Sequence, residues 1–317
     1  MRSSLALLLL AAPLLAEVPT AEELTKWREA YLYKPSPFEA KEEAVESDEK
    51  VILTKVTFPS PVASPDERNN TVEGWLFAPV KDTDRGIVLC PVWKEKKLSA
   101  ERPVARILAK KGFKVLVLAL AYQYDRGPED QFPGQWTMSS DLDRTERVFA
   151  QSVQDLSRAG EWLRTKRGVT EGKLGIAGLS LGGAFASIAY CLDPQWKAAV
   201  LMLAGGDVAT MLWSDNEDLE YVKRELRDYR HFDLEKLRER VRPFDPLTWA
   251  TKDRGKAVFM MNADQDDVVT PAASAKLWEA YGEPKRRMLT GTHTTAGATL
   301  AIVGLDDVVV HFDTHLR

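Results

Sequence analysis

The sequence lacks the residues that define several common protein classes. Its 317 residues include only two cysteines, too few for a disulfide-rich scaffold. Lys and Arg number 43 against 47 Asp and Glu, so the net charge of -4 offers no basic excess for nucleic acid or anionic lipid. Beyond the N-terminus no apolar run reaches about 18 residues, and no membrane-spanning helix is expected. Internal repeats and low-complexity tracts are also absent.

The first 16 residues differ from the rest of the chain. Arg2 precedes an apolar run of leucine and alanine that ends at Ala16, before the acidic Glu17. A positive start, a short apolar run and a small residue before a polar segment are typical of a secretory signal peptide. Residues 1–16 are therefore predicted to be a signal peptide, and the mature protein is predicted to be secreted or periplasmic and free of membrane.

The whole chain is 44% hydrophobic and 28% charged, as in an ordinary globular protein. A capping box at Thr20 and Glu23 predicts a helix to about residue 32, within an N-terminal helical extension over 17–49. The domain that follows, 50–317, alternates short apolar strands with amphipathic helices, which predicts one α/β domain. Strands are expected at 51–58, 71–78, 86–92, 113–122, 173–179, 198–203, 257–261 and 286–289, and the main helices at 100–111, 144–166, 181–192, 272–281 and 296–315.

Continuous apolar strands such as 115–120 are typical of a parallel sheet that helices cover on both faces. The two early strands fit an antiparallel edge of that sheet. Segment 207–250 interrupts the alternation with interleaved charged and apolar residues. It is predicted to be a helical cap inserted at the carboxyl edge of the strands, although its charges alone indicate only a solvated amphipathic helix.

One motif carries chemistry. Residues 178–182 read Gly-Leu-Ser-Leu-Gly between a predicted buried strand and a predicted helix. In that context the pattern is typical of a nucleophile elbow, a strained turn whose flanking glycines let strand and helix approach closely. The Ser180 hydroxyl would project from the sheet edge, and the Leu181 amide at the helix N-terminus would stabilise a developing oxyanion.

This elbow resembles that of the α/β-hydrolases, in particular the secreted esterases near dienelactone hydrolases and acetyl-xylan-type acyl esterases. The resemblance covers residues 50–316. It implies the α/β-hydrolase fold, with an about eight-stranded, mostly parallel sheet, helices on both faces and a helical cap. It also implies a catalytic triad whose members occur in the order nucleophile, acid, histidine.

The resemblance places the base at His293, just past a late strand. Of the other three histidines, His231 lies in the charged insertion and is interpreted as solvated. His311 and His315 lie one helical turn apart, but no third ligand accompanies them, so no metal site is expected. No organic cofactor is implied either.

Three aspartates are candidates for the acid. The family's acid precedes a short Val-Val-Pro-like segment, which favours Asp266; Asp264 and, after the previous strand, Asp207 remain as alternatives. Asp267 is interpreted as a surface or helix-leading residue. The acid would orient His293 and stabilise its imidazolium.

The second oxyanion donor should follow strand 86–92. Family members commonly carry His-Gly and an aromatic residue there, whereas this chain has Pro91, Val92 and Trp93. Pro91 has no N–H, so the Trp93 amide is the expected donor.

Aromatic residues in the loop after strand 113–122 are candidates for the substrate pocket. Tyr122, Tyr124 and Trp136 would form its wall, or would anchor the loop to the core. Arg126 would bind a substrate carboxylate or pair with Asp125 or Glu129.

The two cysteines are not expected to pair. Cys90 closes a strand near the active-site edge, and Cys191 lies 11 residues along the helix from Ser180, about 16 Å away. Both are predicted to be buried free thiols.

The sequence thus predicts a serine hydrolase that cleaves small-molecule carboxylic esters through Ser180, His293 and Asp266, by way of an acyl-enzyme. Two alternatives stay open: an acyl-peptidase-like serine hydrolase and a non-catalytic binding protein with the hydrolase fold. The sequence contains no indication of the oligomeric state.

Overall fold

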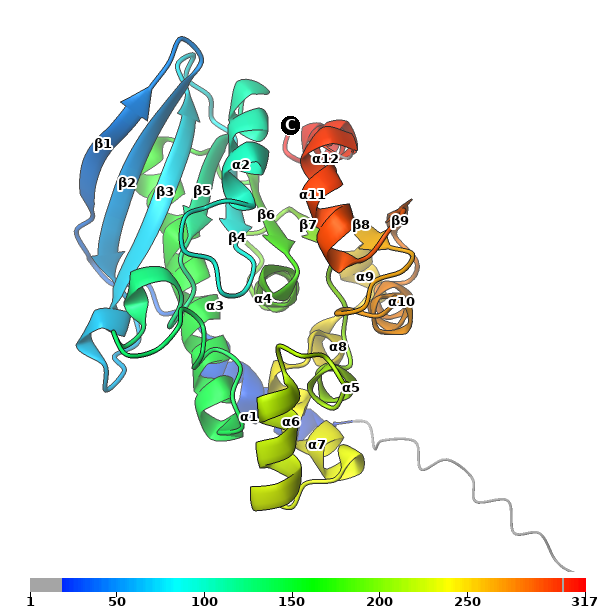
Figure 1. The fold of residues 1–317 in the computed structure, drawn as a ribbon. Helices are drawn as coiled ribbons and strands as arrows, with labels where there is room; N and C mark the ends of the chain where they lie inside the picture. Colours follow the sequence, from blue (N-terminus) through cyan, green and yellow to red (C-terminus); the bar gives the residue numbers. More distant parts are fainter. Residues whose placement is uncertain (1–18, 304) are drawn as a thin grey trace, which may run out of the picture.

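The computed structural model describes residues 19–303 and 305–317, which form one α/β domain with a nine-stranded sheet (Figure 1). The predicted signal peptide, residues 1–16, lies outside the described residues. Helix α1 (Ala21–Tyr31) begins as expected, with the Thr20 side chain and Glu23 capping each other. Tyr31 at its end is buried, and its hydroxyl donates to the Pro243 carbonyl at 2.8 Å, which fastens α1 to the domain.

The sheet has the strand order β1-β2-β3-β5-β4-β6-β7-β8-β9. Strands β1, β2 and β3 are antiparallel to their neighbours, and β4 through β9 pair with one another in parallel. The antiparallel edge expected for the early strands is therefore present. The strands are β1 (Lys41–Ser47), β2 (Val51–Pro59), β3 (Thr71–Pro79), β4 (Gly86–Cys90), β5 (Lys114–Leu118), β6 (Leu174–Leu179), β7 (Ala198–Met202), β8 (Val258–Ala263) and β9 (Lys285–Leu289).

Strand β1 is the one strand that the sequence pattern did not predict. Its sequence, Lys-Glu-Glu-Ala-Val-Glu-Ser, has no apolar alternation, and all seven residues are exposed. Because β1 lies at the sheet edge and pairs only with β2, backbone hydrogen bonding and not burial holds it in place. The predicted helical extension over 17–49 therefore contains both a helix and a strand.

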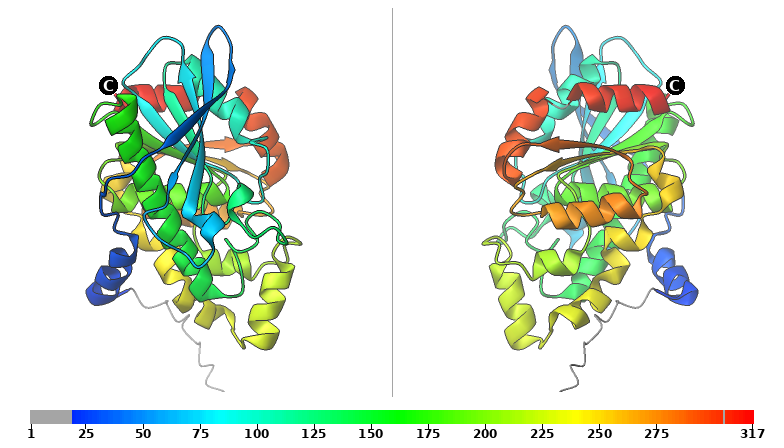
Figure 2. Two further views of the ribbon diagram at one scale, coloured as in Figure 1. Left: turned by 90° about the vertical axis from the view of Figure 1, so that its left-hand side faces the viewer. Right: turned by 90° about the vertical axis from the view of Figure 1, so that its right-hand side faces the viewer.

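Helices cover both faces of the sheet (Figures 1 and 2). Within β5, Val115 and Val117 pack into one apolar cluster, while Leu116 and Leu118 pack into the other. This alternation explains why the central strands are continuously apolar. One cluster joins the sheet to α2 (Glu101–Lys110), α11 (His293–Val303) and α12 (Leu305–His315), and the other joins it to α3 (Leu142–Arg167), α4 (Leu181–Leu192) and α10 (Pro271–Ala280).

The end of the chain forms two helices where the sequence pattern predicted one over 296–315. Helices α11 and α12 meet at an angle of 65°. Asp306 and Asp307 occupy the first turn of α12, where acidic side chains favour a helix N-terminus. No single helix in the described ranges is long and apolar enough to cross a membrane, although this bent pair passes that test by length and composition.

The segment between β7 and the short helix α9 (Lys252–Gly255), which precedes β8, forms the helical cap predicted at 207–250 (Figure 1). Apolar residues such as Val222, Leu226 and Leu237 are fully buried, while the charged residues between them face outward. The segment is therefore a packed amphipathic unit. Its elements are α5 (Val208–Leu212), α6 (Glu220–Arg224), a π-helical turn η3 (Glu225–Tyr229), α7 (Leu234–Val241), η4 (Arg242–Phe244) and α8 (Pro246–Trp249).

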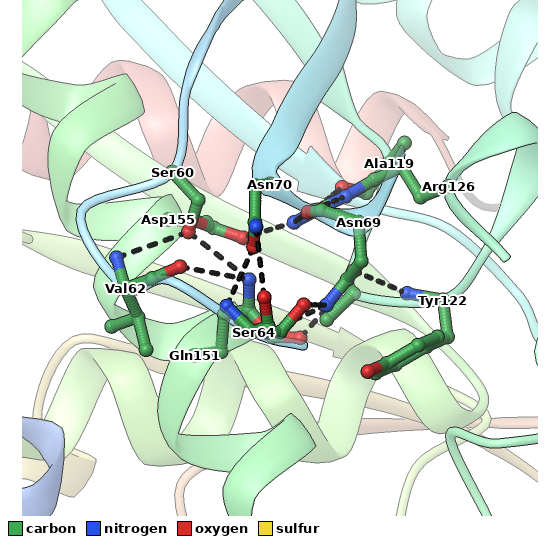
Figure 3. Close-up of polar contacts among 12 residues, drawn as sticks. Ser60, Val62, Ser64, Asn69, Asn70, Ala119, Tyr122, Arg126, Gln151 and Asp155 are labelled. Carbon is green, nitrogen blue, oxygen red and sulfur yellow. Dashed lines mark hydrogen bonds and ion pairs between the residues drawn. The ribbon is translucent and has the colours of Figure 1, made fainter. Parts of the chain in front are cut away.

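Arg126 anchors the loop after β5 from within the core (Figure 3). Its guanidinium donates to the Asp155 carboxylate at 2.8 Å and to the carbonyls of Ala119 and Asn69, and the Arg126 and Asp155 side chains are 1% and 0% exposed. The prediction that Arg126 binds substrate or pairs with a neighbour in sequence is therefore wrong. Glu129 pairs instead with Arg68 at the surface.

Candidate active site

Ser180 occupies the turn between β6 and α4 in a strained backbone conformation. Its φ of 52° and ψ of -121° lie outside the regions that L-residues usually adopt. A Cβ on Gly178 would lie 2.2 Å from the carbonyl oxygen of Gly182, and one on Gly182 would lie 2.4 Å from the carbonyl oxygens of Cys90 and Pro91. The two glycines are thus required by close backbone contacts, and this turn presents Ser180 above the sheet edge.

The structure brings Ser180, His293 and Asp266 together in one line of hydrogen bonds. The Nε2 atom of His293 lies 2.8 Å from the Ser180 Oγ. Its Nδ1 atom lies 2.9 Å from Oδ1 and 2.8 Å from Oδ2 of Asp266. With Nδ1 donating to the carboxylate, Nε2 is free to accept the serine proton, as a general base must.

Asp266 is held firmly in this position. It is 5% exposed, and its Oδ1 accepts hydrogen bonds from the amides of Val268 at 3.0 Å and Val269 at 2.7 Å. These are the two valines whose position after the strand indicated Asp266 in the sequence. These two amide donors fix the orientation of the carboxylate toward His293.

The other aspartates support the histidine loop or the cap. Asp264 accepts from the Gly291 amide at 2.8 Å, and Asp267 accepts from the His293 amide at 3.2 Å, so both shape the loop that carries the base. Asp207 caps α5 and pairs with Lys276. Hydrogen bonding and the pair with Lys276 hold the pKa of Asp207 below its ordinary value although burial opposes this. Neither Asp264 nor Asp207 is bonded to the His293 ring within the described residues.

The backbone amides of Leu181 and Trp93 are the predicted oxyanion donors. Leu181 and Trp93 line the same cleft as Ser180. In the described part of the chain, neither amide donates to another protein group. The carbonyls of Cys90 and Pro91 abut Gly182, so the loop after β4 lies directly against the nucleophile turn.

Comparison with known proteins agrees with this architecture. Residues 95–215 match the family model described as alpha/beta hydrolase domain containing 18. The chain superposes on acetyl xylan esterase 1 from Thermoanaerobacterium sp. with a TM-score of 0.68 and 14% identity, covering 95% of this chain and 96% of that one. The chain has the α/β-hydrolase fold.

Two further similarities accompany that match. A cold-adapted esterase from an Arctic intertidal metagenomic library superposes on this chain with a TM-score of 0.57 and 16% identity, over 87% of this chain and 98% of that one. An uncharacterized protein of Mycobacterium tuberculosis is 27% identical over 146 residues, which is 46% of this chain. That match spans 33% of the relative, so the chain corresponds to about a third of it.

The cleft at Ser180 is mostly apolar, and the cap contributes part of its lining. It opens to solvent. Helices α3 and α4 form its floor, the cap contributes one wall, and the segment after Asp266 contributes another. Its apolar lining residues are Trp93, Met138, Phe149, Leu181, Ala184, Val208, Met211, Leu219, Val268 and Val269.

The three aromatic residues expected in the pocket lie elsewhere. Tyr122 and Trp136 pack against each other at 5.4 Å between ring centroids and line a separate pocket. Tyr124 is buried against Trp75. These rings therefore anchor the loop and do not line the cleft at Ser180.

A contact that the sequence pattern did not predict joins the cap to the loop after β4. The Nζ atom of Lys94 pairs with the Asp218 carboxylate at 2.6 Å, and it lies 4.3 Å from the centroid of the Trp93 ring. Asp218 and the nearby Asn216 also line the cleft. No sequence signal indicates this pair, because its members are 124 positions apart.

The remaining histidines lie away from the cleft. His231 is exposed, as expected. The His311 Nε2 donates to the Ala257 carbonyl at 3.1 Å, and burial together with the neighbouring His315 lowers the pKa of His311 to about 4. Within residues 19–303 and 305–317, no cluster of three metal-ligating side chains occurs.

Both cysteines are free thiols, as predicted. Cys90 is fully buried at the end of β4, and burial raises the pKa of its thiol well above the ordinary value. Cys191 lies beside the Tyr281 hydroxyl at 3.2 Å, and burial raises its pKa to about 11. Neither thiol is a nucleophile near neutral pH.

Proposed function

We propose that the protein is a serine hydrolase that cleaves carboxylic esters. The observation that carries the proposal is the line of short contacts from Asp266 through the His293 ring to the Ser180 Oγ. A serine hydroxyl is a poor nucleophile unless a positioned base removes its proton, and this geometry supplies that base. The strained turn at Ser180 supports the same role, since such strain concentrates at functional sites.

In the proposed reaction the Ser180 Oγ attacks the ester carbonyl carbon while His293 Nε2 accepts the hydroxyl proton. The carbonyl oxygen becomes an oxyanion that accepts hydrogen bonds from the Leu181 and Trp93 amides. The tetrahedral intermediate collapses, the carbon–oxygen bond to the alcohol breaks, and His293 donates its proton to the departing alkoxide. Asp266 stabilises the imidazolium throughout.

Water then hydrolyses the acyl-enzyme. In this second half of the reaction, water is the attacking group and the Ser180 oxygen is the leaving group. His293 takes a proton from the water as it attacks the acyl carbon, and returns the proton to the Ser180 Oγ as that bond breaks. The products are a carboxylic acid and an alcohol. This chemistry requires only side chains and backbone amides that already surround the cleft.

The cleft favours a small ester with an apolar acyl or alcohol group. Its lining is mostly aliphatic and aromatic, and its polar side chains are those of Ser180, Asn216 and Asp218. The structural neighbours named as esterases share the fold at 14% and 16% identity. An acetyl xylan esterase acts, by its name, on an acetylated polysaccharide, and acetyl esters therefore belong among the substrates to be tested.

The experiment is a panel of p-nitrophenyl esters with acyl chains from acetyl to decanoyl, together with the p-nitroanilide of the preferred acyl group. Wild type should hydrolyse the esters, and Ser180→Ala should reduce the rate to background. Equal rates for the two proteins would exclude Ser180 as the nucleophile. Faster cleavage of the anilide than of the ester would favour an acyl-peptidase-like activity instead.

A further inference from the structure

The carboxyl group of Glu101 is buried beside the loop after β4, which carries Val92 and Trp93, and it takes no part in the triad. Glu101 is the first residue of α2, and its side chain is 0% exposed. Its Oε1 accepts a hydrogen bond from the Val92 amide at 2.8 Å. Among the described residues, Oε2 has no partner within hydrogen-bond geometry. Burying a carboxyl group away from a cation costs free energy. The hydrogen bond from the Val92 amide therefore indicates that Glu101 has a structural or functional role at this loop.

That contact fixes the residue immediately before the proposed oxyanion donor. The Val92 amide is bonded to Glu101, whereas the next amide along the chain, that of Trp93, is free within the described part of the chain. Pro91 precedes them, and its ring restricts its own φ. The pyrrolidine ring of Pro91 thus restricts the backbone before Val92, and the hydrogen bond to Glu101 holds the Val92 amide itself.

The rest of the loop is anchored by other groups. The Trp93 indole donates to the Gly134 carbonyl at 2.7 Å, and the Glu95 carboxylate accepts from the amides of Lys96, Lys97 and Ser99. Those contacts lie on the side chain of Trp93 or after it. Among the side-chain hydrogen bonds that the structure describes in this loop, the one from the Val92 amide to Glu101 acts on the backbone that leads into the Trp93 amide.

We propose that Glu101 is a positioning residue that orients the Trp93 amide toward the oxyanion by holding the Val92 amide. The proposal rests on the proposed ester hydrolysis. It explains how this chain forms a second oxyanion donor without the His-Gly sequence typical of the family. It also explains why a carboxyl group is kept in an apolar setting between α2 and the loop after β4.

The hydrogen bond needs an acceptor oxygen and not a charge. Burial raises the pKa of Glu101 to about 7, so its neutral and ionised forms are both present near neutral pH. Either form keeps an oxygen that can accept from the Val92 amide. The groups that face the Glu101 carboxyl are the Tyr124 hydroxyl and, farther off, the Glu95 carboxylate. A glutamine at this position should therefore keep the loop in place.

The test compares three variants on the best p-nitrophenyl ester from the panel, with kcat, KM and the thermal midpoint measured for each. Glu101→Met removes the acceptor at similar volume, Glu101→Gln keeps it, and Glu95→Ala removes a carboxylate from the same loop beyond Trp93. Loss of one oxyanion donor lowers kcat about 10²- to 10³-fold, so Glu101→Met should lower kcat at least about 10-fold with KM within about threefold. Glu101→Gln and Glu95→Ala should stay within about threefold of wild type.

Several outcomes would overturn the proposal. These are an unchanged kcat in Glu101→Met, a change confined to KM, or an equal loss of kcat in Glu101→Gln with the fold intact. If Glu101→Met does not fold, Glu101→Asp takes its place, since its shorter side chain withdraws the acceptor; it should show the same loss, and full activity would overturn the proposal. Wild type against Ser180→Ala reports on the hydrolase function itself, so failure of that function is distinguishable from failure at Glu101.

Discussion

At the scale of single residues, the site depends on three aspartates that lie within four positions of one another. Asp264 and Asp267 hold the backbone of the loop at Gly291 and His293, and Asp266 holds the His293 ring. One carboxylate therefore acts on the imidazole, and two act on the loop that presents it.

This division of roles predicts different effects of two otherwise equal substitutions. Asp266→Asn should lower kcat about 10⁴-fold, because the amide favours the wrong tautomer of the histidine. Asp264→Asn is the matched control and should cost less than about 10-fold, because its oxygen can still accept from the Gly291 amide. The measurement is kcat/KM for both variants, and a larger loss in Asp264→Asn would reassign the triad acid.

Glu101 also makes stability depend on pH. Burial raises its pKa from 4.5 to about 7, so the native state binds the proton more tightly than the unfolded state does. Protonation of Glu101 therefore contributes to the free energy of unfolding fully below about pH 4.5, and this contribution is lost as pH rises through about 7. Glu101→Gln should remove this contribution.

Thermal unfolding of wild type and Glu101→Gln at about pH 5 and about pH 8 measures that effect. The variant should gain several degrees relative to wild type on going to the higher pH. Parallel pH dependence of the two midpoints would contradict the assignment of a raised pKa to Glu101.

At the scale of elements, the loop after β5 is held by a buried ion pair. The Arg126 and Asp155 side chains are almost completely buried, and Arg126 also donates to the carbonyls of Ala119 and Asn69 (Figure 3). Arg126→Met should lower the free energy of unfolding by about 3–5 kcal/mol, because it leaves the Asp155 carboxylate buried without its cation.

Arg68→Met provides the matched control for this element. Arg68 pairs with Glu129 at the surface at 2.6 Å, and exposed pairs contribute about 0–1 kcal/mol. Urea denaturation of both variants separates the two cases. A loss below about 1 kcal/mol in Arg126→Met would show that the buried network does not hold the loop.

The helices and strands were predictable where burial in the core requires an apolar sequence pattern. The apolar strands of the central sheet and helix α4 at 181–192 lie where the sequence pattern placed them, because their side chains meet the core. Strand β1 was not predictable in this way, since every residue in it is exposed and its pairing is made by the backbone. The division of the final helix into α11 and α12 was likewise invisible to an apolar periodicity that continues across it.

The active site was predictable to a similar degree. Ser180, Asp266 and His293 follow strands at one sheet edge, and the elbow motif together with the resemblance to the α/β-hydrolases indicated them. The lining of the cleft comes from α3, α4 and the cap, and such long-range packing leaves no local motif. The aromatic loop was misplaced for the same reason, because its direction depends on the buried Arg126 contacts.

At the scale of the whole molecule, the chain combines a single hydrolase-fold domain with a predicted signal peptide. We expect export and cleavage after Ala16, so that the mature chain begins at Glu17. Cell fractionation with N-terminal sequencing of the protein from its native host measures this. Recovery of an intact Met1 from the cytoplasmic fraction would contradict it.

Active-site labelling tests the central claim, that His293 activates Ser180 as a nucleophile, most directly. Wild type, Ser180→Ala and His293→Ala are incubated with a fluorophosphonate, and the tryptic peptide that contains residue 180 is analysed by mass spectrometry. The geometry predicts one phosphonate on Ser180 of wild type, none on Ser180→Ala, and labelling slowed by at least about 10²-fold in His293→Ala. Absence of the label from Ser180 in folded wild type, or equal labelling rates in wild type and His293→Ala, would contradict the claim.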